Sequence, residues 1–374
     1  MFYIMRISSI TLESYRKFEN LHLSFGENEH IICFTGPNTI GKTNIIEAIY
    51  FLSLVKSFRT DHMESICRWD ADYFSLRGTY LKDRIVLENQ INIVLRPKKQ
   101  RKLRMNGEEL PYSKYVGMVP VVFFSPDDIA SILESPASRR KYLDILLAQT
   151  DPHYLGILVN YQKALKQRNS LLRNVKKHQA QNNELDIWDE SLARFGTQIY
   201  AKRLSLIAYF QMQMQVPYSE ISGDAISTCT LEYVSKYTHE QIVDHDAYLE
   251  ILTAHRDRDV IREATSFGPH RDNFIILKNN MDASTFASRG DIRSMILAMK
   301  LTELHYIQTI TSSNPILLLD DVFSELDSDR QEYLISHIPE GIQTFITTTS
   351  PQIGVLEKRK KEVRFIAVDD LLAK

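Results

Sequence analysis

The sequence predicts an α/β protein in which a mixed sheet with flanking helices carries an inserted, mainly α-helical lobe with a short antiparallel helical arm. Strand-like runs fill residues 3–34 and 71–124 and return after residue 263, whereas residues 136–215 show helical periodicity. A chain of 374 residues is also too long for one simple hydrophobic core. We therefore expect three segments, which are the first part of the α/β lobe at 1–135, the helical lobe at 136–262 and the second part of the α/β lobe at 263–374.

The composition is that of an ordinary globular protein, with 44% apolar and 25% charged residues. A net charge of −2 gives no global basic character, so any surface for nucleic acid must be a local patch. Three sparse cysteines argue against a disulfide framework and for a reducing compartment. The start of the chain does not read as a signal peptide, and no run approaches the roughly 18 apolar residues of a membrane span. We expect a cytoplasmic protein without a membrane partner.

The first strand-like region ends in a glycine-rich loop. The apolar run Ile31–Phe34 leads directly into Gly36, and after Thr43 the segment "NIIEAIYFLSLV" is apolar with a roughly helical period. A strand, a glycine loop and a helix in this order are the context that a phosphate-binding loop needs.

The loop itself, "GPNTIGKT" at 36–43, fits the pattern G-x-x-x-x-G-K-[ST]. Backbone N–H groups of such a loop and the N-terminus of the following helix bind phosphate oxygens. Lys42 would reach the β- and γ-phosphates, and the Thr43 hydroxyl would help to hold Mg²⁺. The residues expected to bind the nucleotide here are Gly36, Pro37, Asn38, Thr39, Ile40, Gly41, Lys42, Thr43 and Asn44.

Residues 71–124 contain a hairpin with a basic edge. Asn106-Gly107 stands between two strand-like stretches and predicts a type I′ turn. The preceding segment "RPKKQRKLR" at 96–104 is either a solvated hairpin edge or a patch that contacts the phosphates of nucleic acid.

The helical region begins at "SPASRRKYLDILLAQ", where Ser135 or Ser138 could cap a helix. The segment "KKHQAQNNELD" has no apolar stripe and separates two helical stretches. We expect two antiparallel helices of about 24 residues, each roughly 36 Å long, although ordinary core helices would give the same pattern. The apolar residues with helical spacing are Leu155, Leu158, Leu165, Leu172, Trp188, Leu192, Phe195 and Ile199.

An acidic pair follows the clearest buried strand. Four successive apolar residues, Ile316–Leu319, indicate a strand covered on both faces, and "GIQTFITTTS" at 341–350 reads as another. Asp320 stands where it could bind Mg²⁺, and Asp321 could polarise an attacking water. An acidic pair in a surface turn is the alternative.

A third motif is "FASRGDIRSMILAMKLTEL", in which Ser288 and Gly290 precede a long amphipathic helix. Ser288 can cap the helix, and Gly290 allows a close approach of the backbone. The motif is either a helix cap only or a second phosphate-binding corner.

The order of these motifs is that of ATP-binding-cassette proteins: phosphate loop, insertion, Ser-x-Gly helix, acidic strand. Over essentially its full length the chain resembles the RecF family of bacterial recombinational-repair ATPases, which are related to SMC proteins. "SFRT" and "QRNSLL" favour this family over transporter subunits. The resemblance rests on "GPNTIGKTNIIEAIYFLSLVKSFRT", "VVFFSPDDI", "SPASRRKYLDILLAQTDPHY", "YQKALKQRNSLL", "GPHRDN", "ASRGDIR" and "LLLDDVFSELD".

The resemblance implies roles for the motif residues in an ABC-type P-loop ATPase head. Gly36 through Thr43 would wrap the triphosphate of ATP, Asp320 would serve Mg²⁺, and Asp321 would be the candidate base. Ser288 and Gly290 would face the γ-phosphate of the other protomer. Three further segments are implied: Asp327 at the dimer seam, Phe124–Asp128 as a γ-phosphate sensor, and Thr347–Thr349 where many relatives have a switch histidine.

The function implied by the resemblance is that of an ATP-driven homodimeric clamp in DNA replication, repair of DNA damage and the SOS response. The clamp would bind gaps and junctions of single- and double-stranded DNA, act with RecO and RecR mediators to load recombinase, and hydrolyse ATP slowly as a weak DNA-dependent ATPase. A scaffold with a weakened site and a transporter ATPase subunit are the alternatives. Candidate DNA contacts are Lys98, Lys99, Arg101, Lys102, Arg104, Arg139, Arg140, Lys141 and "LEKRKK" at 356–361.

The chain departs from the family pattern at two positions. Thr39 replaces the usual glycine, so either the backbone there is not left-handed or the loop is slightly strained, because a β-branched residue disfavours positive φ. Asp291 replaces the usual glutamine, and its negative charge would repel a nearby γ-phosphate. Both changes bear on the hydrolysis rate and on the strength of the dimer.

Overall fold

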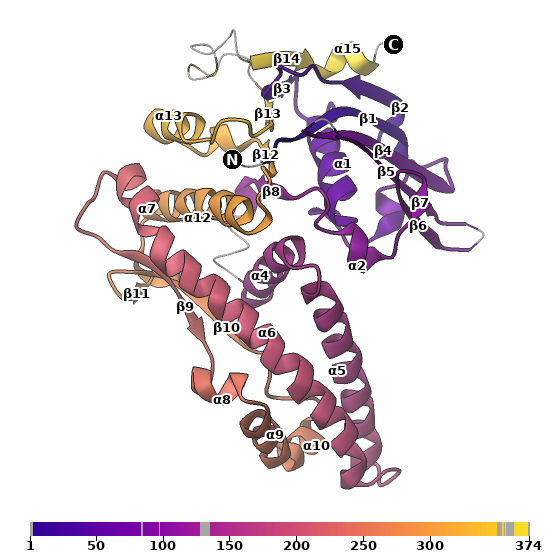
Figure 1. Ribbon diagram of the computed structural model, residues 1–374, viewed down its shortest axis with the longest axis vertical. Helices are drawn as coiled ribbons and strands as arrows, with labels where there is room; N and C mark the ends of the chain where they lie inside the picture. The colour runs from indigo at the N-terminus through magenta and orange to yellow at the C-terminus, as the bar shows by residue number, and fades with distance from the viewer. Residues whose placement is uncertain are drawn as a thin grey trace. The chain divides into compact units, whose positions relative to one another are not determined.

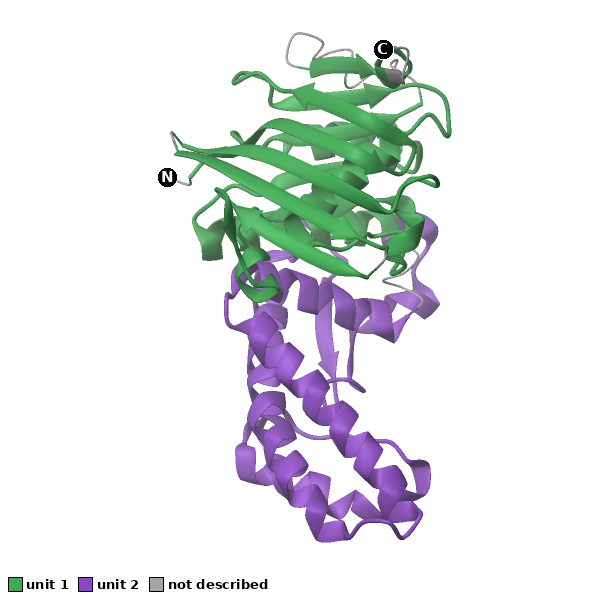
Figure 2. Ribbon diagram, turned by 90° about the vertical axis from the view of Figure 1, so that its right-hand side faces the viewer, with its two compact units in different colours: residues 1–130, 293–374 green, residues 131–292 purple. Residues whose placement is uncertain are grey.

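A computed structural model describes residues 3–83, 85–96, 98–127, 135–349, 354, 356 and 363–372 (Figure 1). The chain forms two compact units, the first from 1–130 with 293–374 and the second from 131–292 (Figure 2). The helical lobe that we expected at 136–262 lies within the second unit, but that unit continues to residue 292. The boundaries differ because β10 (Asn273–Lys278) pairs with β9 (Cys229–Val234) inside the second unit.

The core of the first unit is a five-stranded parallel sheet in the order β14-β3-β13-β12-β8. Every residue of β3, β12 and β13 is buried, as the continuous apolar runs predict for a sheet covered on both faces. The strands are β3 (Ile31–Thr35), β8 (Val121–Phe124), β12 (Ile316–Asp320), β13 (Thr344–Thr348) and β14 (Val363–Ala367).

A second, six-stranded antiparallel sheet follows the order β2-β1-β4-β5-β6-β7. The predicted hairpin joins β6 to β7, and Asn106 and Gly107 have φ angles of 49° and 83°, as a type I′ turn requires. The strands are β1 (Met5–Tyr15), β2 (Phe18–Ser24), β4 (Tyr73–Lys82), β5 (Ile85–Val94), β6 (Gln100–Met105) and β7 (Glu108–Glu109).

Helix α1 (Lys42–Leu54) packs against strands of both sheets of the first unit. Eleven of its thirteen residues are buried, including Glu47, which pairs with Arg16, so the helix is enclosed in the core. The other helices whose residues lie mainly in this unit are η1 (Met63–Ser65), α2 (Tyr112–Tyr115), α12 (Arg289–Thr311), η3 (Val322–Ser324), α13 (Ser328–Ser336) and α15 (Val368–Leu372).

The second unit contains the predicted arm. Helices α5 (Tyr154–Lys176) and α6 (Asp186–Gln213), of 23 and 28 residues, pack side by side in opposite directions (Figure 1), and η2 (Asn182–Leu185) forms the turn between them. Ser135 accepts a hydrogen bond from the Ser138 N–H and caps α4 (Pro136–Thr150), so Ser135 is confirmed as the helix cap.

The same unit also contains a three-stranded antiparallel sheet in the order β11-β10-β9. Its elements in chain order are α4 (Pro136–Thr150), α5 (Tyr154–Lys176), α6 (Asp186–Gln213), α7 (Gln215–Ser222), β9, α8 (His239–Val243), α9 (His245–Ala254), α10 (Arg256–Arg262), β10, β11 (Met281–Asp282) and α11 (Ala283–Phe286).

Among the described residues, no helix combines the length and the apolar character that crossing a membrane requires. All three cysteines carry free thiols, as their sparse spacing predicts, and all three are buried: Cys33, Cys67 and Cys229.

Candidate nucleotide-binding site

The glycine-rich loop connects the buried strand β3 to the N-terminus of α1. Gly36 and Gly41 have φ angles of 141° and 120°, which side chains rarely tolerate. A Cβ atom at Gly41 would also come within 2.9 Å of the Phe18 ring. Gly41 is the N-cap of α1 and has no side chain to cap it, so the first N–H groups of the helix are available to an anion.

Thr39 has a φ angle of 70°, and its backbone is therefore left-handed. Of the two alternatives that the sequence left open, the strained loop is the correct one. The Lys17 ammonium donates a hydrogen bond of 2.9 Å to the Thr39 carbonyl, which supports the loop in this conformation.

The side chain of Lys42 curls back over the loop. Its ammonium donates to the carbonyl oxygens of Gly36 at 2.7 Å and Pro37 at 2.8 Å, and the residue is only 7% exposed. Burial lowers the pKa of Lys42, and the nearby carboxylates of Asp321 and Asp320 oppose this shift. A phosphate in the loop would offer oxygens to the same cation.

Asp320 joins the acidic strand to the loop. One carboxylate oxygen, Oδ1, accepts hydrogen bonds from the Thr43 hydroxyl at 2.9 Å and the Thr347 hydroxyl at 2.7 Å. Burial raises the pKa of Asp320, while these two hydrogen bonds favour the ionised form. The Asp321 N–H donates to the Thr347 hydroxyl at 3.0 Å, so Thr347 holds both aspartates in place.

The donor set fits a magnesium ion that shares its ligands with a phosphate. Mg²⁺ usually binds one or two carboxylates, waters and substrate phosphates rather than a closed protein cage. Thr43 and Asp320 supply a hydroxyl and a buried carboxylate whose raised pKa a cation would offset. The described residues contain no group of three or more His, Cys, Asp or Glu side chains that could hold a metal.

Sequence reasoning missed several neighbours of the loop. A Cβ atom at Gly36 would lie 3.5 Å from the Asp369 carboxylate, which comes from the C-terminal helix α15. Within "SFRT", a motif that we had quoted without a role, the Arg59 guanidinium donates to the Asn44 side chain at 3.1 Å. Lys17, whose ammonium reaches the Thr39 carbonyl, completes this set. Thr347 was already expected near the site as part of 347–349, but its hydrogen bond to Asp320 was not.

The Ser-x-Gly corner lies in the second unit, at the start of α12, whereas the phosphate loop lies in the first. The Asp291 N–H donates to the Ser288 hydroxyl at 3.2 Å, and that hydroxyl donates to the Asp291 carboxylate at 2.8 Å. The helix cap is therefore present, while the contact of Ser288 and Gly290 with a γ-phosphate stays a prediction. Burial would raise the pKa of Asp291, but the Lys278 ammonium, 2.6 Å away, and Ser288 hold it below its usual range.

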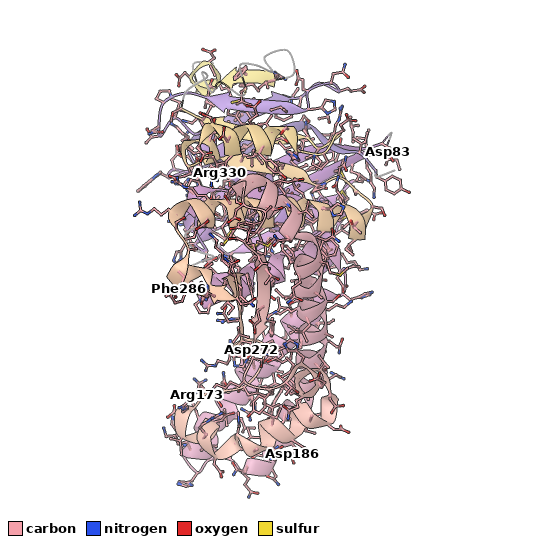
Figure 3. All side chains as sticks on the ribbon, turned by 90° about the vertical axis from the view of Figure 1, so that its left-hand side faces the viewer. Asp83, Arg173, Asp186, Asp272, Phe286 and Arg330 are labelled. Atoms are coloured by element: carbon pink, nitrogen blue, oxygen red, sulfur yellow. The ribbon has the colours of Figure 1, made fainter. Side chains whose placement is uncertain are left out.

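Asp327 caps α13 by accepting a hydrogen bond of 3.0 Å from the N–H of Arg330, a residue labelled in Figure 3. Its place at a dimer seam stays a prediction. Asp128, the end of the implied sensor segment, lies outside the described residues, as does 357–361 of "LEKRKK".

The residues that could contact DNA differ in the interactions that they make within the protein. Lys99 pairs with Glu64, and Arg101 stacks on the Tyr112 ring with 4.8 Å to its centroid. At the base of the arm, Arg139 and Arg140 donate hydrogen bonds to residues of the loop that leads into β10 and of β10 itself, and so hold the second unit together.

The chain matches the model of the RecF/RecN/SMC N-terminal domain over residues 6–370. It is 36% identical over 371 residues to the DNA replication and repair protein RecF of Bacillus thuringiensis (strain Al Hakam), with 97% of each chain covered. The chain belongs to the RecF family. The same identity and coverage hold for the RecF protein of Bacillus cereus (strain AH187).

Solved structures agree with this assignment. A structure of the recombination mediator protein RecF with ATP in the RecFOR pathway matches with a TM-score of 0.86 at 33% identity, and 94% of each chain is covered. A head domain of Smc from Pyrococcus furiosus has a TM-score of 0.54 at 14% identity and shares the fold alone. The fold is the ABC-type ATPase head that RecF and SMC proteins share, as predicted, and a transporter subunit is not favoured.

Proposed function

We propose that this chain is an ATP-dependent DNA-binding protein of replication and recombinational repair. The observation that carries the proposal is the hydrogen bond of 2.9 Å between Thr43 and Asp320, which brings the phosphate loop and the acidic strand to one site. Lys42 would bind the β- and γ-phosphates of ATP, and Thr43 and Asp320 would hold Mg²⁺, which neutralises phosphate charge when it is bound. The related proteins named RecF support the cellular role.

Bound ATP would control the association of two copies of this chain. Ser288 and Gly290 of a second copy would face the γ-phosphate held by Lys42, so that ATP joins two protomers and its slow hydrolysis, with Asp321 as base, releases them. The resulting homodimer would close on gaps and junctions of single- and double-stranded DNA in the cytoplasm. Mediators of the RecO and RecR type would then load recombinase there.

Sedimentation with and without ATP tests the clamp. We expect the mass to double with ATP, Lys42→Arg to abolish the change, and Asp321→Asn to trap the dimer because the bound water loses its base. Thr311→Ser, a substitution on α12 outside the loop and the acidic strand, is the matched control. An unchanged mass at an ATP concentration that saturates the protein would refute the clamp, and absence of ATP binding would refute the site.

A further inference from the structure

The second unit has a trough on the exposed side of α9 and the first turns of α6. Two adjoining hollows of about 640 and 380 Å³ form it, and both are lined by Leu249 and Thr253. Asp186, labelled in Figure 3, marks the α6 side of the trough near the end of the arm. The residues of the trough are Asp186, Ile187, Glu190, Asp246, Leu249, Glu250, Thr253, Ala254 and Arg256.

The trough is a shallow, open surface that follows one face of α9. On α9 its residues recur at the i, i+3, i+4, i+7 and i+8 positions that share one helix face, beginning at Asp246. Helix α9 packs against α6, as Figure 1 shows. Two packed helices leave a groove between their side-chain ridges, and the ridge of a third helix fits into such a groove.

Part of the trough is apolar and exposed. Ile187 is 70% exposed although it is a large aliphatic residue, Leu249 is half-buried, and Ala254 is exposed. An apolar strip with a polar rim is typical of a surface that binds another protein.

The rim is acidic. Asp186, Glu190, Asp246 and Glu250 line the two hollows. Arg256 pairs with Asp186 at 2.5 Å, and His245 lies 3.1 Å from both Glu190 and Asp246. Within the described ranges Glu250 has no ion-pair partner, so the carboxylates outnumber the cations around the trough.

We propose that this trough is a docking site for a basic amphipathic helix of a partner protein. Large aliphatic side chains on one face of the partner helix would cover Ile187 and Leu249, and its lysines or arginines would pair with the acidic rim. DNA is excluded as the occupant because its phosphates carry the same sign of charge as the rim. The proposal does not depend on the nucleotide site, since the trough residues all belong to the second unit and the phosphate loop to the first.

A designed peptide tests the trough in the full-length protein without nucleotide. The probe is a fluorescent helix of about 18 residues, about 27 Å long, with leucines at i, i+3, i+4 and i+7 and lysines on its other faces. Two matched peptides replace every lysine by glutamate or every leucine by serine. By fluorescence anisotropy we expect the basic leucine peptide to bind, more weakly at high salt, and the two matched peptides not to bind.

Substitutions inside and outside the trough test where the peptide binds. Glu250→Lys and Ile187→Ser should each weaken binding about tenfold. The first removes a negative charge of the acidic rim, and the second removes an apolar contact. Both residues are exposed, so the fold should tolerate the changes. Glu232→Lys, an exposed charge reversal on β9 that lines neither hollow, should leave the affinity within about twofold. Equal binding to all variants would overturn the proposal, as would a self-association of the chain that Glu250→Lys abolishes, because the occupant would then be a second copy.

Discussion

Thr39 is the residue at which this loop departs most from what a phosphate loop prefers. A β-branched side chain at a φ of 70° carries strain of about 1–3 kcal/mol, which glycine would not have. The Lys17 ammonium on the Thr39 carbonyl is the interaction that offsets part of this strain. The loop therefore keeps its shape by a contact from the β1–β2 turn rather than by glycine at this position.

Replacing Thr39 by glycine should stabilise the protein relative to a matched replacement next to it. Asn38 is not among the described residues with positive φ, so glycine relieves no strain at this position. Asn38→Gly therefore only raises the conformational entropy of the unfolded chain, which lowers stability. Thr39→Gly has the same entropic cost but also removes the strain. We expect Thr39→Gly to be more stable than Asn38→Gly by about 1 kcal/mol in calorimetric unfolding. Equal stability would mean that the loop is not strained at Thr39.

The charge of Asp291 is balanced within the same unit. Lys278 and Ser288 hold its carboxylate at 2.6 and 2.8 Å, so the corner that would meet a γ-phosphate is not left with a free negative charge. The departure from glutamine is thus accompanied by a cation from β10.

Removal of Lys278 should expose that charge if the proposed clamp is correct. We expect Lys278→Met to weaken dimerisation with a non-hydrolysable ATP analogue about tenfold, and the double variant Lys278→Met/Asp291→Gln to recover most of it. Lys202→Met, which breaks the ion pair between Lys202 of α6 and Asp151, the C-cap of α4, is the control. Sedimentation equilibrium measures all four proteins, and a double variant as weak as Lys278→Met would contradict the role of the pair.

At the scale of elements, the arm is fixed by a buried polar network. Arg168 of α5 is fully buried and pairs with Asp189 of α6 and, at 2.7 Å, with Asp259 of α10. Asn169 accepts hydrogen bonds from the N–H and the hydroxyl of Thr265. "QRNSLL" is therefore a structural motif that attaches the loop after α10 to the arm.

The same loop holds His270 in its neutral form. Its Nδ1 accepts from the Tyr161 hydroxyl at 2.7 Å, and its Nε2 donates to the Thr265 carbonyl at 3.1 Å. Burial lowers the pKa of His270 to about 4. The unfolded chain takes up this proton below about pH 6.5, whereas the folded protein does not until about pH 4, so stability falls as the pH falls through this window.

The expected loss is roughly 3 kcal/mol between pH 7 and pH 4, at about 1.4 kcal/mol per pKa unit. The fluorescence of Trp188 on α6 reports the unfolding of the second unit, because the other tryptophan, Trp69, is already fully exposed in the folded protein. Urea unfolding followed by this fluorescence should show a smaller pH dependence in His270→Gln. His245→Gln is the control, because a hydrogen bond to Asp246 raises the pKa of His245 and its contribution runs in the opposite direction. An unchanged pH dependence in His270→Gln would exclude His270 as the source.

At the scale of the whole molecule, features that depend on neighbouring residues in the sequence were predicted, whereas features that depend on long-range pairing were not. Continuous apolar runs predicted the parallel strands, and Asn106-Gly107 predicted the hairpin, because both depend on neighbours in sequence. The role of Thr347 was not predictable in this way, since its hydroxyl meets Asp320 only after the register of β12 and β13 pairs the two residues. The end of the second unit at 292 likewise depends on the pairing of β9 with β10.

The net charge of the whole chain constrains how it can bind DNA. With a charge of −2 there is no global attraction, so the proposed affinity must come from a local cluster such as the β6 hairpin. Lys98, Lys99, Arg101 and Lys102 are all exposed there, but Lys99 pairs with Glu64 and Arg101 stacks on Tyr112.

Neutralising Lys98 and Lys102 should therefore change the salt dependence of DNA binding. Each phosphate contact contributes about 0.9 to the slope of log K against log salt on duplex DNA, so Lys98→Gln/Lys102→Gln should lower the slope by about 2 and weaken binding to all sequences alike. Lys163→Gln/Lys166→Gln, on exposed positions of α5, removes the same charge elsewhere. Because both variants have the same net charge, an equal loss in both would mean that overall charge, and not the hairpin, sets the affinity.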